Sequence, residues 1–269
     1  AEASDVLRRG QADAVVVFSH KSPPQVLADA SNPNMAQTAV TYIQSILAQQ
    51  AQTRGATISA NTRALYNPQL KSAYNFAPAI MGMVFLLVCS LMTAVSVVRE
   101  KETGTMEVLL VSPVRPIKLI VSKMVPFFIL SCLDLTLILV IAKYLLNVPL
   151  SSGVAPVIAV SLLYIVLAME VGLLVSTVAK TQVVAMLVAG MIMIMPVLML
   201  SGMLFPVDNL PVVLHEIAYV VPAKWYIDAM RKLMVMGLGL GDVLKELLIL
   251  LAMALVLVVV ALKQFNDRL

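Results

Sequence analysis

A dense charged segment lies between two long apolar runs of this chain. It reads REKETGTMEVLLVSPVRP from Arg99 to Pro116 and carries acidic and basic side chains next to apolar ones. Flanked in this way, the segment is expected at a membrane surface, within reach of a soluble protein. Such chemistry would also suit a docking surface, in which an apolar helix face enters a groove while charges set orientation.

The middle of this segment predicts a short helix, Thr105 to Val111, ended by Ser112-Pro113. Such a helix exposes Met106 and Leu110 one turn apart, beside Glu102 and Glu107. The pattern alone favours an ordinary charged loop with an amphipathic turn that faces lipid. Docking into a groove on another protein is the alternative.

Two acids stand inside apolar runs, Asp134 and Glu170. Each either anchors its helix to a polar partner or lines a cavity where it meets a proton or a substrate charge, and both interpretations stay open. Asp134 is expected in the outer half of its span and Glu170 in the inner half, so the two should not meet. Met195 and Met199 belong to a methionine-rich run that offers an adaptable substrate surface, although packing is the commoner role.

Catalytic and metal-binding patterns are absent from the sequence. His20 and His215 are isolated, and Cys89 and Cys132 lie inside apolar runs. The chain has no Gly-Lys dipeptide and therefore no phosphate-binding loop of the Walker type. Any ATP chemistry must come from a partner.

Composition identifies the class of protein. Hydrophobic residues make up 60% of the chain and charged residues 13%, and the mean hydropathy is +0.94. Soluble domains carry about 25% charged residues. A net charge of +4 spread over several loops indicates membrane orientation rather than nucleic-acid binding. The sequence therefore predicts a polytopic α-helical membrane protein.

Apolar stretches near the bilayer-spanning length of about 20 residues predict the transmembrane helices. Five are expected, at about 76–98, 119–142, 154–178, 183–205 and 243–263. Lysine and arginine are in modest excess on the side that contains Arg99 to Pro116, which places that side in the cytoplasm.

Residues 1–75 are then external, yet nothing in them resembles an export signal or a first membrane helix. We therefore expect that the chain begins partway through a longer protein with six spans. A strand at 13–18 and a helix at about 35–52 predict the remainder of a small external α/β domain.

Residues 207–241 are too polar and proline-broken to span a membrane but too apolar for a free loop. They predict an external re-entrant segment of two short helices broken at Pro222. Trp225 and Tyr226 suit the lipid headgroup region. Asp228 can pair at four-residue spacing with Lys224 or Lys232.

Two motifs carry a resemblance to a known family. The element from Arg99 to Leu110, followed by Ser112-Pro113-Val114, resembles the EKE-x-GT signature of ABC type-2 transporter permeases. The segments SGMLFP at 201–206 and VPAKWY at 221–226 are similar to the external re-entrant segment that precedes the last helix in that family. Together with the order of the spans, the resemblance covers about residues 66–265, while the N-terminal part is similar to the external domain of multidrug-type members.

The resemblance implies a half-transporter in the bacterial cytoplasmic (inner) membrane that exports a hydrophobic or amphipathic substrate. Its implied partners are cytoplasmic ABC ATPase subunits that hold ATP and Mg, a second permease chain and a periplasmic adaptor. The chain itself holds no cofactor under this interpretation. The residues implied in coupling to the ATPase are Glu100, Lys101, Glu102, Gly104, Thr105, Met106, Glu107 and Leu110.

The candidate translocation path consists of Asp134, Glu170, Met195 and Met199. A secondary transporter and a membrane-anchored assembly subunit are the alternative functions. The sequence shows no internal repeat, which a secondary transporter usually has.

Overall fold

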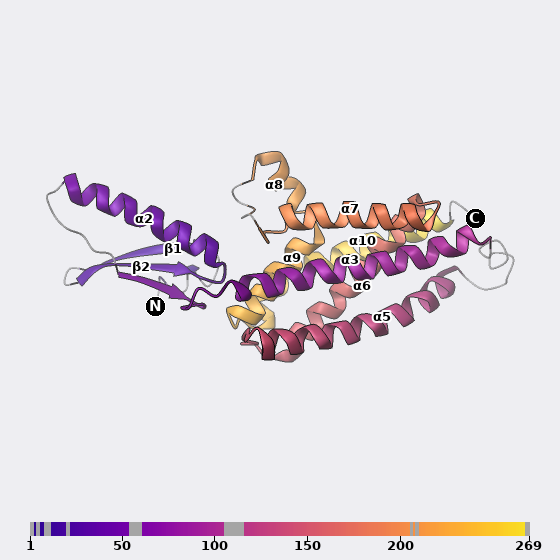
Figure 1. Cartoon of the computed structure of the whole chain (residues 1–269), viewed down its shortest axis with the longest axis horizontal. Helices are drawn as coiled ribbons and strands as arrows, with labels where there is room; N and C mark the ends of the chain where they lie inside the picture. The colour runs from indigo at the N-terminus through magenta and orange to yellow at the C-terminus, as the bar shows by residue number, and fades with distance from the viewer. Residues whose placement is uncertain are drawn as a thin grey trace.

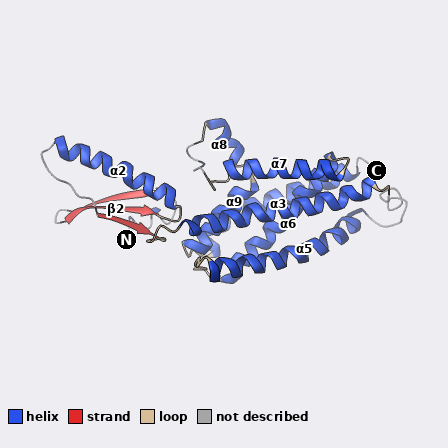
Figure 2. Cartoon of the chain, in the orientation of Figure 1, coloured by secondary structure: helices blue, strands red, loops and turns tan. Residues whose placement is uncertain are grey.

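The computed structural model of the chain describes residues 3, 6–7, 12–19, 22–53, 61–104, 116–204, 207 and 210–266. Figure 1 shows a long helical bundle with a small sheet at one end, and Figure 2 shows that the strands of the described residues all lie in that small part. The main elements are β1 (Ala14–Ser19), β2 (Ser22–Asp29), α2 (Pro33–Thr53), β3 (Asn61–Leu65), α3 (Ser72–Glu102), α5 (Pro116–Val140), η1 (Ile141–Leu145), α6 (Val154–Val178), α7 (Gln182–Leu200), α8 (Val212–Ala218), α9 (Pro222–Met230), η3 (Arg231–Val235), η4 (Leu240–Val243) and α10 (Leu244–Asn266).

The sheet has three strands in the order β1-β2-β3. β1 and β2 are antiparallel, β2 and β3 are parallel, and α2 packs on the sheet. Its core is built from small side chains, chiefly Ala28, Ala30 and Ala36. The strand predicted at 13–18 and the helix predicted at 35–52 are β1 and α2, and a core this small gives little independent stability.

Five helices are long and apolar enough to cross a membrane, which confirms the predicted polytopic helical fold in the part of the chain that the structure describes. They are α3, α5 with η1, α6, α7, and α10 with η4. α7 ends at Leu200, earlier than the predicted end at Phe205, because the chain turns at Gly202, whose φ is +77°. An L side chain rarely adopts that conformation, so glycine suits the turn.

The core of the bundle lies between α3 and α6. Gly172 of α6 packs so closely on α3 that a Cβ placed there would lie 2.4 Å from the carbonyl oxygen of Ser90. Tyr164 of α6 donates a hydrogen bond to the carbonyl oxygen of Gly82 on α3 at 2.9 Å. These contacts hold the two helices side by side along the middle of the bundle (Figure 1).

The region between α7 and α10 contains two short helices, as predicted, and α9 begins at Pro222. α9 is buried against α3, α6 and α10. The side chains of Trp225 and Tyr226 are buried in the protein, and their depth at the lipid headgroups stays a prediction. Tyr226 stacks on Tyr164 with ring centroids 4.1 Å apart, and its hydroxyl is 2.9 Å from that of Ser161.

Candidate functional site: the two polar ends of the bundle

The charged run Arg99–Gly104 forms the end of α3 at the far end of the bundle from the sheet (Figure 1). The Thr103 hydroxyl donates to the carbonyl oxygen of Arg99 at 2.9 Å, and the Gly104 backbone N–H donates to the carbonyl oxygen of Lys101 at 3.3 Å. Gly104 has a φ of +73°, so it supplies the left-handed residue with which many helices end. The run is therefore held in a defined geometry.

Three successive side chains of this run contact three different spans. Glu100 forms an ion pair with Lys123 of α5. The Lys101 ammonium donates to the carbonyl oxygen of Ser176, in the last turn of α6, at 2.5 Å. The third contact, made by Glu102, completes a set of three consecutive charges that reach three neighbouring helices.

The third side chain reaches the start of α7. The Glu102 carboxylate accepts hydrogen bonds from the Gln182 backbone N–H at 3.3 Å and from the Gln182 side-chain amide at 2.7 Å. Backbone N–H groups of a first helical turn lack partners within the helix, and a negative charge there is stabilising. Glu102 therefore ties α3 to the first turn of α7.

These contacts give Glu100, Lys101 and Glu102 partners inside this chain, whereas the sequence assigned them to an ATPase contact. The ATPase contact stays a prediction, and the structure shows that these three side chains also have contacts within the chain. The predicted docking helix falls outside the described residues, and so do its members Thr105, Met106, Glu107 and Leu110.

The two acids of the apolar runs lie on different helices. Glu170 of α6 is buried, and its Oε2 has no hydrogen-bond partner among the described residues. Asp134 of α5 is half-buried and lies near the middle of the span Ser122–Leu145. Met195 and Met199 lie on the outward face of α7, with 66% and 43% of their surface exposed. None of the four side chains lines the cavities of about 410 Å³ and 110 Å³.

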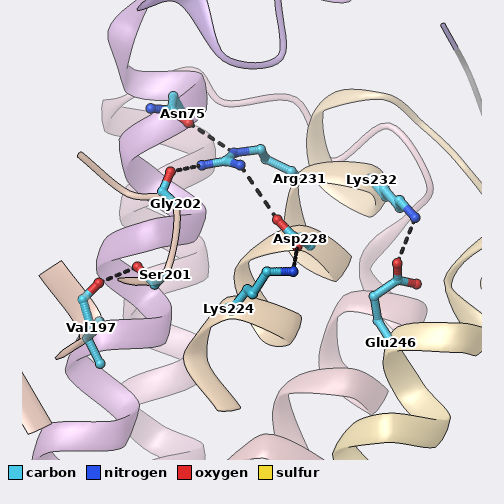
Figure 3. Close-up of polar contacts among 9 residues, drawn as sticks. All are labelled: Asn75, Val197, Ser201, Gly202, Lys224, Asp228, Arg231, Lys232 and Glu246. Carbon is cyan, nitrogen blue, oxygen red and sulfur yellow. Dashed lines mark hydrogen bonds and ion pairs between the residues drawn. The ribbon is translucent and has the colours of Figure 1, made fainter. Parts of the chain in front are cut away.

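A second polar cluster, which sequence reasoning missed as a unit, lies at the end of the bundle that bears the sheet (Figure 3). Arg231 donates from Nε to the side-chain oxygen of Asn75 on α3 and from Nη2 to the carbonyl oxygen of Gly202, both at 2.9 Å. Its Nη1 lies 3.7 Å from a carboxylate oxygen of Asp228. One guanidinium thus connects α3, α9 and the turn after α7.

Opposite charges of this cluster lie within pairing distance of one another. The Lys224 ammonium is 3.6 Å from Asp228 and 4.3 Å from the ring centroids of both Tyr219 and Trp225. Burial raises the pKa of Asp228, and the neighbouring Arg231 and Lys224 oppose that rise. Burial likewise lowers the pKa of Arg231. The pairing therefore offsets the cost of desolvating these groups.

Of the two lysines predicted as partners of Asp228, the structure pairs Lys224 with it. The ammonium of Lys232 instead donates to the Glu246 carboxylate of α10 at 2.7 Å. The reason is that α9 passes into a π-helical turn at Arg231–Val235, which changes the four-residue spacing assumed for an α-helix.

The cluster also meets the small domain. A cavity of about 110 Å³ is lined by Asn32 and Met35, at the start of α2, and by Lys224, Asp228 and Arg231. The Asp29 carboxylate of β2 attracts the Arg231 guanidinium and raises its pKa, against the effect of burial. The sheet-bearing domain therefore rests on the charged end of α9.

The chain resembles known transporter proteins over almost its whole length. A family model described as ABC-2 family transporter protein matches residues 1–263. The chain is 30% identical to the probable multidrug ABC transporter permeases YbhS and YbhR of Escherichia coli K12, over 80% and 79% of its length and 59% of each relative. It is 26% identical to the inner membrane transport permease YhhJ of the same organism, over 90% of its length and 67% of that protein.

The chain spans about three fifths of the length of the first two relatives. The matched region includes all five membrane-spanning helices, apart from the last residues of α10. This chain belongs to the ABC-2 family of transporter proteins.

Proposed function

We propose that this permease is the membrane-spanning half of an ATP-driven exporter, which moves a hydrophobic or amphipathic substrate out of the cytoplasm or its inner leaflet. We place ATP and Mg on a separate cytoplasmic subunit, because two relatives are named permeases and residues 1–269 contain no phosphate-binding loop. The names of two relatives, multidrug permeases, support this substrate class. Transport then needs a second permease chain, and a periplasmic adaptor is a further candidate partner.

The observation that carries the proposal is the set of contacts made by the charged run. Glu100, Lys101 and Glu102 join the end of α3 to α5, α6 and α7. A partner that displaces this end of α3 would also pull on α5, α6 and α7 through these contacts. The contacts are suited to this because charge-assisted hydrogen bonds are about twice as strong as neutral ones. The run is thus suited to pass motion from an ATPase to the bundle.

The substrate path is proposed to include Glu170, Asp134, Met195 and Met199. The buried and partly unpaired carboxylate of Glu170 supports a functional role, because an ionisable group in a membrane helix is costly to keep. The exposure of both methionines supports a path completed by a second permease chain.

The proposal is tested with the complex of this chain and its ATPase in proteoliposomes. Lys101→Met removes the bond to the α6 carbonyl, and Lys263→Met removes an exposed lysine at the same end of the bundle. We expect Lys101→Met to lower substrate-stimulated ATP hydrolysis while leaving assembly intact, and Lys263→Met to behave as the wild type. Transport driven by an ion gradient without ATP would contradict the proposal.

The docking helix has its own test. We expect the double variant Met106→Ala with Leu110→Ala to lower co-purification of the ATPase without affecting membrane insertion. Burial of each apolar side chain is worth about 1.5–3 kcal/mol, whereas an exposed charge pair is worth under about 1 kcal/mol. Glu107→Gln should therefore have a smaller effect that depends on salt. Unchanged association in the double variant would mean that coupling runs elsewhere.

A further inference from the structure

A groove of about 410 Å³ lies between α5 with η1 and the first half of α6. Leu135 and Leu139 of α5 form its buried side, and Ile158 and Leu162 of α6 line the other. This volume falls within the range of small-molecule sites, about 300–1,000 Å³. The groove belongs to neither of the polar clusters described above.

The local backbone explains why the two helices leave this space. α5 changes to a π-helical turn at Ile141–Leu145, and the chain then reverses through Asn147, whose φ is +50°. The Val148 backbone N–H donates to the carbonyl oxygen of Ala142 at 2.9 Å, which folds the connection back before α6 begins at Val154. α5 itself lies at the edge of the bundle (Figure 1).

The groove opens to the outer surface of the described bundle. Val140 and Ile158 on its rim keep 50% and 37% of their surface exposed, and both lie inside candidate membrane spans. Its lining is apolar over most of its length, so bulk water is a poor occupant. An alkyl chain buries the exposed apolar surface without leaving a polar group unpaired.

One end of the groove is positively charged. Lys143 and Tyr144 line it within the last turn of the span, and the ammonium of Lys143 is 5.5 Å from the Tyr144 ring centroid. No acidic side chain lines the groove, and Lys143 has no carboxylate within ion-pair distance in the part of the chain that the structure describes. A lysine and a tyrosine at the end of a span are at the depth of lipid headgroups.

We propose that this groove is a binding site for an anionic phospholipid, with one acyl chain between α5 and α6 and the phosphate at Lys143. The apolar groove matches an acyl chain, and the one lysine that lines it matches a negatively charged headgroup. A soluble anion would use the lysine but not the groove, and an uncharged hydrocarbon would use the groove but not the lysine. The lipid would stabilise the position of α5, the span to which Glu100 is tied.

The test is native mass spectrometry of the purified, delipidated permease titrated with either phosphatidylglycerol or phosphatidylcholine. Lys143→Ala should lower the retained phosphatidylglycerol about fivefold, the typical contribution of one lysine near an anionic surface, and leave phosphatidylcholine unchanged. Lys245→Ala is the matched control, because Lys245 is an exposed lysine at the same end of the bundle, beside Trp225 and away from the groove.

A second variant tests the acyl-chain position with the charge intact. Ile158→Trp fills the groove from α6 and should lower retention of both lipids. Equal retention of phosphatidylglycerol by the Lys143→Ala and Lys245→Ala variants would overturn the proposal. So would full retention of both lipids by Ile158→Trp, since the chain would then lie elsewhere, for example because another helix covers this face.

Discussion

Gly172→Ala should separate the two central helices of the bundle. The added methyl group would lie 2.4 Å from the carbonyl oxygen and 2.8 Å from the Cα of Ser90, and 2.9 Å from the Cβ of Thr93. Two of these atoms belong to the backbone of α3 and cannot rotate away. Ordinary contact begins at 3.4 Å, so α3 and α6 must move apart by about 1 Å, from 2.4 to 3.4 Å.

Overpacking of this kind costs about 1–3 kcal/mol, and alanine returns about 0.5–1 kcal/mol through its higher helix propensity. Because backbone atoms form the obstacle, we expect a net loss of about 2 kcal/mol, toward the upper end of that range. For a chain of this size, such a loss corresponds to an apparent Tm lower by about 4–8 °C. The assay is thermal unfolding of the detergent-purified permease, followed by the loss of monodisperse protein.

Gly190→Ala in α7 is the matched control, because a Cβ at that position meets nothing within 4 Å. This variant should melt at or slightly above the wild-type temperature, since only the gain in helix propensity of about 0.5–1 kcal/mol applies. A Gly172→Ala protein as stable as Gly190→Ala would refute the close α3–α6 contact, and with it the argument that α3 moves together with α6.

Three further outcomes follow from the polar contacts. Glu102→Ala removes both hydrogen bonds to Gln182, so it should lower transport-linked ATP hydrolysis of the complex while changing the apparent Tm little, because both bonds are exposed to solvent and Thr181 still caps α7. Lys232→Met leaves the Glu246 carboxylate buried without its cation and should cost about 3 kcal/mol, which a fall in apparent Tm at neutral pH would measure. Burial raises the pKa of Asp228 above 3.8, so the free energy of unfolding should fall as the pH rises from 3.8 through the raised value, and Asp228→Asn should flatten that part of the Tm–pH curve.

The spans could be predicted from the sequence because hydropathy and length alone define them. The predicted third span, at about 154–178, matches α6, and the other four differ from the structure mainly at their ends. Helix ends depend on local backbone geometry, such as the positive φ of Gly202 that ends the fourth span early. Periodicity carries no information about such turns.

The polar clusters could be predicted only in part. The sequence identified the charged run at Glu100–Glu102, but it gave no sign that Lys101 bonds the carbonyl oxygen of Ser176, which is 75 positions away. Asn75 and Arg231 are 156 positions apart. An amphipathic pattern tells which residues share a helix face but not whether lipid or protein covers it. For that reason the sequence did not show that Tyr226 stacks on Tyr164.

Site-specific photo-crosslinking in intact membranes tests the central claim most directly. A benzoylphenylalanine placed at Thr103, which is exposed at the end of α3, should crosslink to the ATPase subunit. The same probe at Tyr144, which is exposed in the last turn of the span Ser122–Leu145, at the end away from Glu100, should not. Crosslinking from Tyr144 alone, or from neither position in cells that contain the ATPase, would contradict the claim that the charged run couples this permease to ATP hydrolysis.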